Sequence, residues 1–488
     1  MTSSAMDVSS KPPLPTGIVA VVKRDCATCV LVAPVLDELA AAGVSLTVYT
    51  QDDPTFPAGA TRPVDDTDLA VSWHHDIETV PTLLKVDSGL EQERIVGWSK
   101  TQWRDFSSID GLGEELPEQR PGCGSLSVDP SMADELQVRF GGSTLTSRRI
   151  GFAALEDEFE AAFDRGWTDG LPVVPPTEVR VMKMLEGTTR DPSEMVAVVP
   201  PDLNEATVEQ VAINAVMAGC KPEYLPVVLA AVEAACSDAF NMHGLLATTY
   251  FSGPIIIVNG PIAARIGMNA EYNVLGQGNR ANMTIGRALQ LVVLNLGGGR
   301  PGEVDQSAIG SPGKLGLCFA EREHDSPFAP LAVDRGVAPE TNAVTLFAGQ
   351  GPTGIVDQIS RGPESLAASL AASLTASCHP KLAIGFDAML VVGPEHGRIF
   401  AEAGWDRPRL LAELEQLLTR PGADLVRGAG GIDEGLPEAF AEVPIPKFRP
   451  DGLQIVHAGG DAGLFSAILG GWVGGAKGSV PTTVEIKN

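Results

Sequence analysis

Short apolar runs and one helical pattern organise the first part of the chain. Residues 18–23 (IVAVVK) are mostly β-branched and predict a buried strand. Between residues 32 and 39 the apolar positions recur every three or four residues, and Gly43 follows, which predicts a helix and its end. Thr101 is the expected cap of a last helix. Further strands are predicted at residues 44–50, 80–86 and 94–98.

Longer apolar runs dominate residues 149–488, where no internal repeat and no long linker occurs. Residues 382–392 (LAIGFDAMLVV), with two shorter runs at 254–258 and 454–456, predict strands buried on both faces, as in a mostly parallel sheet. We therefore predict an α/β chain in which a smaller N-terminal domain precedes one large mixed α/β domain. Helices of the large domain are predicted at residues 152–165, 207–219 and 226–240.

Periodicity is lost between the two predicted domains. Residues 111–148 are rich in Gly, Pro, Ser and acidic side chains, which favours a linker. Residues 1–16 have no apolar periodicity and none of the features of a secretory signal, so they predict a disordered lead. The domains are therefore expected at residues 17–110 and 149–488. Without an export signal, the expected location is the cytoplasm.

Net charge, apolar runs and the number of cysteines exclude some classes of function. The 488 residues include 62 Asp and Glu against 35 Lys and Arg, a formal net charge of −27, which disfavours nucleic acid and anionic membranes as partners. No stretch approaches the roughly 18 consecutive apolar residues that a membrane span needs. In a reducing cytoplasm the seven cysteines are expected to be redox or catalytic groups rather than a disulfide framework.

Two of these cysteines, Cys26 and Cys29, lie at the predicted start of the first helix. The positive end of a helix stabilises a thiolate on Cys26, and Cys29, one turn later, can resolve a mixed disulfide. A C-x-x-C pair alone is also half of a zinc site, for which His74-His75 is the nearby second pair.

Further motifs surround this pair: Pro34, five residues after Cys29, the Val80-Pro81-Thr82 motif, the Gly89 turn and Ile95-Val96-Gly97. Together with the pair, these motifs resemble the thioredoxin family over residues 17–110. The resemblance implies a thioredoxin-like fold, a redox-active Cys26–Cys29 pair and a cis Pro81 that faces it. The pair Ala27-Thr28 departs from the family, which leaves the direction of electron flow open, and a fold used only for docking is the alternative.

Residues 149–488 resemble a poorly characterised set of bacterial proteins. The shared motifs are W-T-D-G-L-P-V-x-P-P-T, G-N-R-A-N, G-G-x-R-P-G-E and a glycine-rich C-terminal segment. Some of those relatives are associated with Cys- or selenocysteine-Gly-Ser motifs, which Cys123-Gly124-Ser125 resembles. Cys123 is expected to be either a mobile third thiol that carries reducing equivalents between domains or an incidental surface thiol.

Four glycine-rich loops of the large domain predict a pocket for an anion. Their backbone N–H groups suit anionic ligands, and Arg280 and Arg300 can add bidentate contacts. Tight turns with surface arginines are the alternative. The loops are residues 276–282, 297–303, 310–314 and 459–461. The candidate substrate-binding residues are Asp169, His243, Arg280, Asn282, Arg300 and Glu303.

Cys378 and two histidines are the candidate catalytic groups of the large domain. Cys378 precedes a predicted strand, whereas His396 and His457 follow predicted strands, where ligands of open α/β sheets bind. A hydrogen-bonded structural histidine is the alternative for each. No zinc-binding pattern such as H-E-x-x-H occurs, so the sequence indicates no cofactor and leaves a metal site open.

These features predict a thiol-dependent redox enzyme, in which a C-x-x-C domain serves a large domain acting on a small anionic substrate. Cys26 would attack and Cys29 would resolve, while Cys123 or Cys378 would relay electrons to or from a cellular thiol reductant or oxidant. Two alternatives stay open: a cysteine- or metal-dependent lyase or hydrolase that cleaves a carbon–heteroatom bond, and a redox-controlled binding protein. Self-association into a homo-oligomer also stays open.

Overall fold

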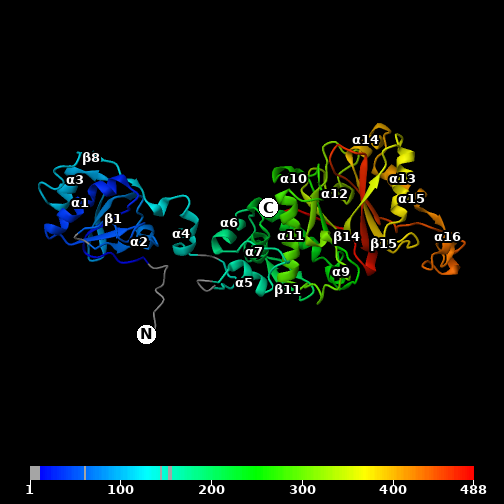
Figure 1. Cartoon of the computed structure of the whole chain (residues 1–488), viewed down its shortest axis with the longest axis horizontal. Coiled ribbons are helices and arrows are strands. Elements are labelled where there is room, and N and C mark those ends of the chain that lie inside the picture. The colour runs from blue at the N-terminus through cyan, green and yellow to red at the C-terminus, as the bar shows by residue number, and fades with distance from the viewer. Residues whose placement is uncertain (1–10, 60–61, 143–144, 152–155, 488) are drawn as a thin grey trace. The chain divides into compact units, whose positions relative to one another are not determined.

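The computed structural model describes residues 11–59, 62–142, 145–151 and 156–487 (Figure 1). By its internal contacts it divides into two compact units, residues 1–144 and residues 145–488. Each unit mixes helices with parallel and antiparallel strand pairs, so the predicted α/β class is confirmed at this level.

The N-terminal unit contains a five-stranded sheet in the order β3-β2-β1-β5-β6. The central strand β1 (Gly17–Val22) runs parallel to β2 (Leu46–Thr50) and antiparallel to β5 (Thr82–Asp87). At the edges, β3 (Val64–Asp65) is parallel to β2 and β6 (Leu90–Val96) is antiparallel to β5. The β-branched run of residues 18–22 therefore forms the central strand of the sheet, where it is buried.

Helix α1 (Ala27–Ala41) packs on this sheet with the apolar face that the sequence predicts. Its residues Val32, Val35, Leu36 and Leu39 are at most 1% exposed and share one core with the strands. Two more helices follow, α2 (Ala70–His74) and α3 (Lys100–Ser107). The cap of α3 is Ser99, whose hydroxyl accepts the amide of Gln102, and not Thr101 as predicted.

Residues before and after this core also pack onto it. Of the predicted disordered lead, residues 1–10 lie outside the described residues. The remainder differs from the prediction, because Leu14 is buried in the core and the carbonyl oxygen of Pro12 lies 2.8 Å from Nε2 of His75. One apolar anchor is enough to hold so short a segment, and a single anchor leaves no periodicity in the sequence.

The structure also differs from the linker predicted over residues 111–148. Two short strand pairs tie this stretch to the N-terminal unit: β7 (Trp98–Ser99) with β8 (Gln119–Arg120), and β4 (Thr79–Val80) with β9 (Cys123–Gly124). Backbone pairing of this kind is independent of side-chain pattern, so it escapes a search for periodicity. Residues 143–144 lie outside the described residues.

Helix α4 (Ala133–Phe140) closes the N-terminal unit. Its residues Leu136 and Phe140 are buried with Leu69, and the ring of Phe140 lies 5.6 Å from that of Trp73 on α2. Residues on both sides of Cys123 are therefore anchored to the same unit.

The C-terminal unit is built on one sheet in the order β13-β12-β14-β19-β15-β18, with β20 paired to β14. The outermost strands meet at their ends, because the backbone N–H of Arg322, after β13, donates to the carbonyl oxygen of His457, on β18, at 2.8 Å. The strands are β12 (Gly253–Asn259), β13 (Leu317–Ala320), β14 (Ala343–Val356), β15 (Phe386–Val392), β18 (Leu453–His457), β19 (Phe465–Val473) and β20 (Thr482–Glu485). Shorter strands are β10 (Met195–Val199), β11 (Asn204–Thr207), β16 (Arg420–Pro421) and β17 (Pro444–Ile445).

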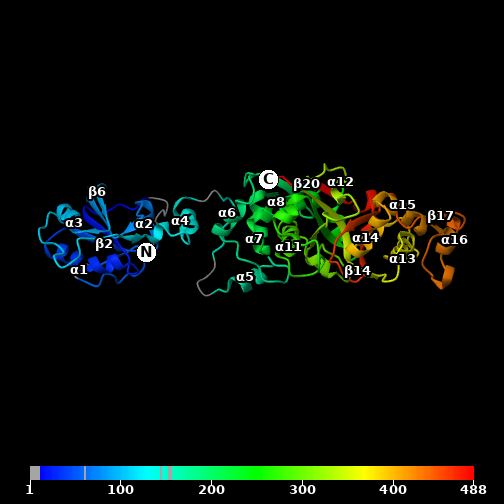
Figure 2. The ribbon, with the colours of Figure 1, turned by 90° about the horizontal axis from the view of Figure 1, so that it is seen from above.

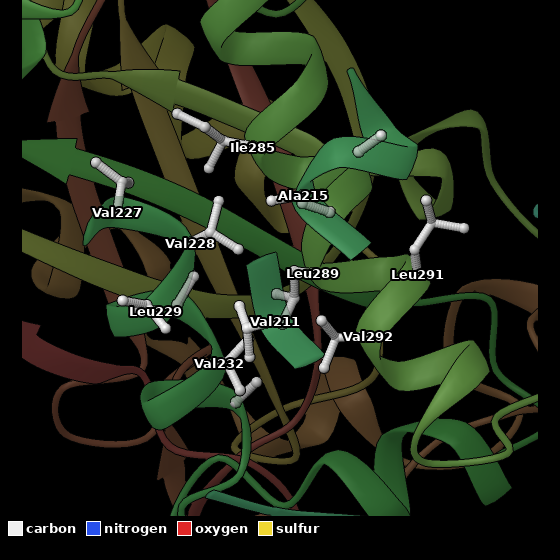
Figure 3. Close-up of a cluster of buried hydrophobic side chains, with 14 of the residues drawn as sticks. Val211, Ala215, Val227, Val228, Leu229, Val232, Ile285, Leu289, Leu291 and Val292 are labelled. Carbon is white, nitrogen blue, oxygen red and sulfur yellow. The ribbon is translucent and has the colours of Figure 1, made fainter. Parts of the chain in front are cut away.

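Two groups of helices cover this sheet (Figure 2). The group with α7, α8 and α11 packs on β12 and β14, and the group with α13 and α15 packs on β15. Figure 3 shows side chains of α7, α8 and α11 converging in the first of these cores. The larger helices are α7 (Val208–Ala218), α8 (Leu225–Ala235), α11 (Arg280–Asn295), α13 (Pro363–Thr375), α14 (Pro394–Glu402) and α15 (Arg407–Leu418). The others are α5 (Glu158–Asp164), α6 (Glu178–Leu185), α9 (Met242–Ala247), α10 (Pro261–Arg265), α12 (Leu331–Asp334) and α16 (Gly422–Leu425).

The predicted helices of this unit are present, with shifted ends. α7 matches residues 207–219 closely, since Thr207 and Gln210 form a capping box and Gly219 ends the helix at a φ of 88°. α8 is shorter than residues 226–240. α5 begins after its cap Asp157, and residues 152–155 of the helix predicted there lie outside the described residues.

The prediction of a mostly parallel sheet was wrong. In the described part of this sheet, only the β12–β13 and β15–β18 pairs are parallel, while β14 and β19 run antiparallel to their neighbours. In β15, Ala388 and Leu390 face the core of α13 and α15, whereas Met389 and Val391 face the inner core of the sheet. A continuous apolar run therefore reports burial of both faces, and it carries no information on strand direction.

Among the described residues, no helix combines the length and the apolar character needed to cross a membrane.

We predict that Leu289→Ala destabilises the C-terminal unit by about 2–5 kcal/mol, because Leu289 is 1% exposed in the core of Figure 3 and truncation leaves a cavity. Met283→Ala, on the same helix at 43% exposure, should change stability by no more than about 0.5 kcal/mol. Urea unfolding of the full chain measures both. Equal losses in the two variants would contradict this packing.

Candidate functional site

The thiol of Cys26 lies at the N-terminus of α1, between that helix and β1. Cys26 is the N-cap residue, and its Sγ accepts the backbone N–H of Cys29 at 3.3 Å. Asp52 fixes the preceding turn by accepting the backbone N–H groups of Arg24 and Asp25 at 2.7 and 2.8 Å. The sulfur therefore occupies the position at which a helix end stabilises negative charge.

Cys123 lies directly against this thiol. Its Sγ is 2.7 Å from Sγ of Cys26, and no disulfide joins the two sulfurs. Strand β9 places it there, because Cys123 pairs with Val80 in an antiparallel register. Sγ of Cys26 also lies 3.5 Å from the carbonyl oxygen of Val80, and the following peptide bond, to Pro81, is cis. Four of the residues selected from the sequence thus meet at one point: Cys26, Cys29, Pro81 and Cys123.

The three thiols differ in acidity. Burial works to raise the pKa of Cys26, but the hydrogen bonds from Cys123 and from Cys29 to its sulfur outweigh burial, so that pKa is lowered. Burial raises the pKa of Cys29, and the neighbouring Cys26 sulfur raises it further. Burial also raises the pKa of Cys123, with its hydrogen bond to Cys26 as the second cause. The thiolate therefore belongs on Cys26, with Cys29 and Cys123 as protonated neighbours.

The residues around Cys123 are held by a series of short hydrogen bonds; we call residues 121–127 the docked segment. The hydroxyl of Thr28 donates to the carbonyl oxygen of Pro121 at 2.7 Å. Beyond Cys123, the backbone N–H of Ser125 donates to Glu78 O at 3.0 Å, and the hydroxyl of Ser127 donates to Ile77 O at 2.6 Å.

A buried glutamine recognises the docked segment. Gln51 is 1% exposed, and its amide nitrogen donates to the hydroxyls of Ser125 and Ser72 at 2.6 and 2.7 Å. Its amide oxygen accepts the backbone N–H of Leu126 at 3.1 Å. The hydroxyl of Ser72 donates to Asp66, whose pKa burial raises to about 6. Both ends of the Gln51 amide are thus satisfied by residues of the docked segment.

The candidate cysteine of the C-terminal unit, Cys378, has a different setting. It has a positive φ of 63°, and the hydroxyl of Tyr250 lies 3.5 Å from its sulfur. The buried ammonium of Lys447 donates to the carbonyl oxygens on either side, those of Ser377 and His379, at 2.9 and 2.7 Å. Burial lowers the pKa of Lys447 to about 8. Cys378 is therefore held in an uncommon backbone conformation beside a phenol and an ammonium group.

The two candidate histidines are buried among backbone partners. His396 is 0% exposed, and its ring nitrogens lie 2.8 Å from the hydroxyl of Ser466 and 3.0 Å from the carbonyl oxygen of Asp357. Nδ1 of His457 lies 2.9 Å from the carbonyl oxygen of Arg322, and burial lowers the pKa of His457. Both ring nitrogens of His396 are therefore hydrogen-bonded, whereas Nε2 of His457 is buried without a hydrogen-bond partner among the described residues.

The candidate anion-binding residues make several separate contacts in the C-terminal unit. Asp169 pairs with Arg287 at 2.7 Å, and Arg300 donates to the carbonyl oxygen of Gly166 at 2.9 Å, so both tie residues 166–172 to the region of α11. Arg280, exposed on the first turn of α11, donates to Gly219 O. Of the others, Asn282 is buried against Asn269, and His243 and Glu303 are exposed.

Sequence reasoning missed several of the groups that build these sites. Gln51 and Thr28 contact the docked segment, and Arg287 holds Asp169. In the C-terminal unit a buried ion pair joins Glu321 to Arg407 at 3.2 Å. Gln51 follows a predicted strand and Thr28 lies between the two cysteines, and neither has a spacing that indicates its contact. The ion pairs join residues more than eighty positions apart, which no local pattern reveals.

Neither a metal-binding cluster nor the open hollow described below involves the candidate residues of the described chain. Within the described ranges, no three or more His, Cys, Asp or Glu side chains are grouped as they would be around a metal ion. A hollow of about 460 Å³ is lined by Glu186, Gly187, Pro222, Glu223, Pro226 and Arg265, none of them selected from the sequence. Its two carboxylates do not favour an anionic ligand.

Comparison with known proteins gives no family for this chain: no family model matches it, and no curated protein matches it either.

We predict that Cys123→Ala raises the pKa of Cys26, because it removes a hydrogen bond that lowers this pKa. Cys123→Ser keeps a hydroxyl donor and should retain most of the lowered pKa. The rate of Cys26 alkylation by iodoacetamide as a function of pH measures it, since only the thiolate reacts. Identical midpoints in the two variants would contradict a role for this hydrogen bond.

Proposed function

We propose that the chain is a thiol-dependent redox enzyme whose thioredoxin-like N-terminal unit serves a C-terminal unit acting on a small anionic substrate. The observation that carries the proposal is the setting of Cys26: its sulfur caps α1, lies 2.7 Å from Cys123 Sγ and has a lowered pKa. The central β1 leading into C-x-x-C and α1, with a cis Pro81 after Val80, supports the thioredoxin-like assignment.

The proposed exchange follows from the acidities of the thiols. The Cys26 thiolate attacks one sulfur of a disulfide, and the other sulfur leaves as a thiolate and takes up a proton. Cys29 then loses its proton and attacks Sγ of Cys26, which releases the second product thiol and leaves a Cys26–Cys29 disulfide. Because the pKa of Cys29 is raised, the second step needs deprotonation at the moment of attack. A cellular dithiol restores the reduced pair.

In this proposal the C-terminal unit supplies the substrate site. Arg280 supports an anionic substrate, because its side chain is exposed on the first turn of α11, where the helix end adds positive potential. The Cys26 and Cys29 dithiol would supply two electrons and two protons and become a disulfide, while one bond X–Y of the bound substrate is cleaved to X–H and Y–H.

A second candidate function rests on Cys378. A thiol held beside Tyr250 and Lys447 suits a cysteine-dependent lyase or hydrolase, with the N-terminal unit only keeping Cys378 reduced. Turnover that survives Cys26→Ser when a chemical reductant is present, and is lost in Cys378→Ser, would favour this alternative.

Titration of the full chain in a dithiol–disulfide buffer, followed by alkylation and mass spectrometry, tests the first function. We predict one two-electron transition that Cys26→Ser abolishes, because Cys26 is the only thiol in contact with both neighbours among the described residues. Cys236→Ser is the matched control: Cys236 ends α8 and burial raises its pKa to about 12, so its loss should change nothing. A transition that persists in Cys26→Ser would refute the proposal.

A further inference from the structure

The docked segment covers the thiol that the proposed function needs. Cys26 is only 3% exposed, whereas Cys123, the residue above it, is partly exposed. A disulfide from outside therefore meets Cys123 before it can reach Cys26. If Cys123 were an incidental thiol on a loose linker, it would not cover Cys26, and an outside disulfide could reach Cys26 first.

The fit of the docked segment depends on one glycine. A Cβ at Gly122 would lie 2.4 Å from Cγ2 of Thr79 and 2.8 Å from the carbonyl oxygen of Val80, distances at which atoms must move. At Gly124 a Cβ would meet nothing within 4 Å. The backbone thus approaches β4 closely on one side of Cys123 and is open on the other, as an extended peptide does in a binding groove.

Anchors on both sides keep Cys123 at this place. Before it, the indole N–H of Trp98 donates to Pro117 O at 2.6 Å, and the backbone N–H of Lys100 donates to Glu118 O at 2.9 Å. After it, Leu136 and Phe140 are buried on the N-terminal unit. Both anchors lie outside residues 121–127, so they hold this stretch at a high local concentration near Cys26.

We propose that the docked segment is an internal substrate of Cys26, so that Cys123 is the first thiol to exchange with outside disulfides and passes them to Cys26. The inference deepens the proposed function and rests on it. It names the immediate reaction partner of Cys26: an extended Gly-Cys-Gly-Ser peptide of the same chain, in place of a free small molecule.

The exchange starts at Cys123, which has a raised pKa and so loses its proton at the moment of attack. Its sulfur attacks an outside disulfide and becomes a mixed disulfide, while the first outside thiol leaves with the proton that Cys123 gives up. The Cys26 thiolate attacks Sγ of Cys123, so that a Cys26–Cys123 bond forms and the second outside thiol leaves with a proton. Cys29 then attacks Sγ of Cys26, which forms the Cys26–Cys29 disulfide and returns Cys123 to the thiol state. In total, the outside disulfide is reduced and one dithiol is oxidised.

The trapping experiment uses the full chain with Cys29→Ser, oxidised with about 0.1 mM glutathione disulfide and mapped by mass spectrometry. We expect a Cys26–Cys123 disulfide in roughly tenfold or greater excess over glutathione on Cys26, since the tethered thiol acts at about millimolar concentration. Glutathione on Cys26, with Cys123 left as a free thiol, would overturn the inference and leave the proposed function intact. A wild-type chain in which Cys26 exchanges with no disulfide would overturn both.

A matched pair of glycine variants tests the docking itself. Gly122→Ala should raise the limiting rate at which iodoacetamide alkylates Cys26, reached at high pH where Cys26 is fully ionised, by roughly tenfold or more, because the added Cβ displaces the docked segment. Gly124→Ala should leave the rate unchanged. Thr28→Val, which removes only the hydrogen bond to Pro121, should give a smaller increase in the same direction. Cys29, which is 0% exposed, must stay unmodified in each sample, so that undocking is distinguished from unfolding. Equal rates for wild type and all three variants would overturn the inference.

Discussion

The contact between the sulfurs of Cys26 and Cys123 is the interaction on which the account of this chain depends. The contact needs two features: the N-terminus of α1, which Cys26 caps, and a second chain segment that carries Cys123. The pairing of β4 with β9 holds that segment in register. The helix end and the Cys123 thiol both favour the thiolate, while burial opposes it. Loss of the docked segment would therefore change the acidity of Cys26 and its exposure together.

Hydrogen bonds rather than apolar area hold the docked segment in place. Gln51 binds Ser125 and Leu126, Thr28 binds Pro121, and few apolar side chains take part between the anchors. Each such bond contributes only about 0.5–1.5 kcal/mol net, because water replaces it when the segment leaves. Such a segment can open locally while the core of the N-terminal unit stays folded, which is what an exchange partner of Cys26 requires.

Neighbouring residues in the sequence were sufficient to predict the position of the thiol pair and several helices and strands. The C-x-x-C pair at a helix start, the apolar face of α1, and the cap and stop of α7 all follow from neighbouring residues. Features made by distant residues were not accessible: the pairing of Cys123 with Val80, the ion pair of Asp169 with Arg287, and the direction of the strands in the large sheet. The guanidinium of Arg300, in a glycine-rich loop, donates to the carbonyl oxygen of Gly166, 134 positions away, a contact that no local pattern reveals.

Hydrogen exchange of the reduced full chain, read at single amides, tests the central claim most directly. The amides of Ser125 and Leu126 donate to Glu78 O and to the side chain of Gln51 only while the segment is docked. The account predicts that both exchange about a hundredfold or more slowly than they would in an unstructured chain. Exchange at the unstructured rate, with the amides of α1 still protected, would contradict it.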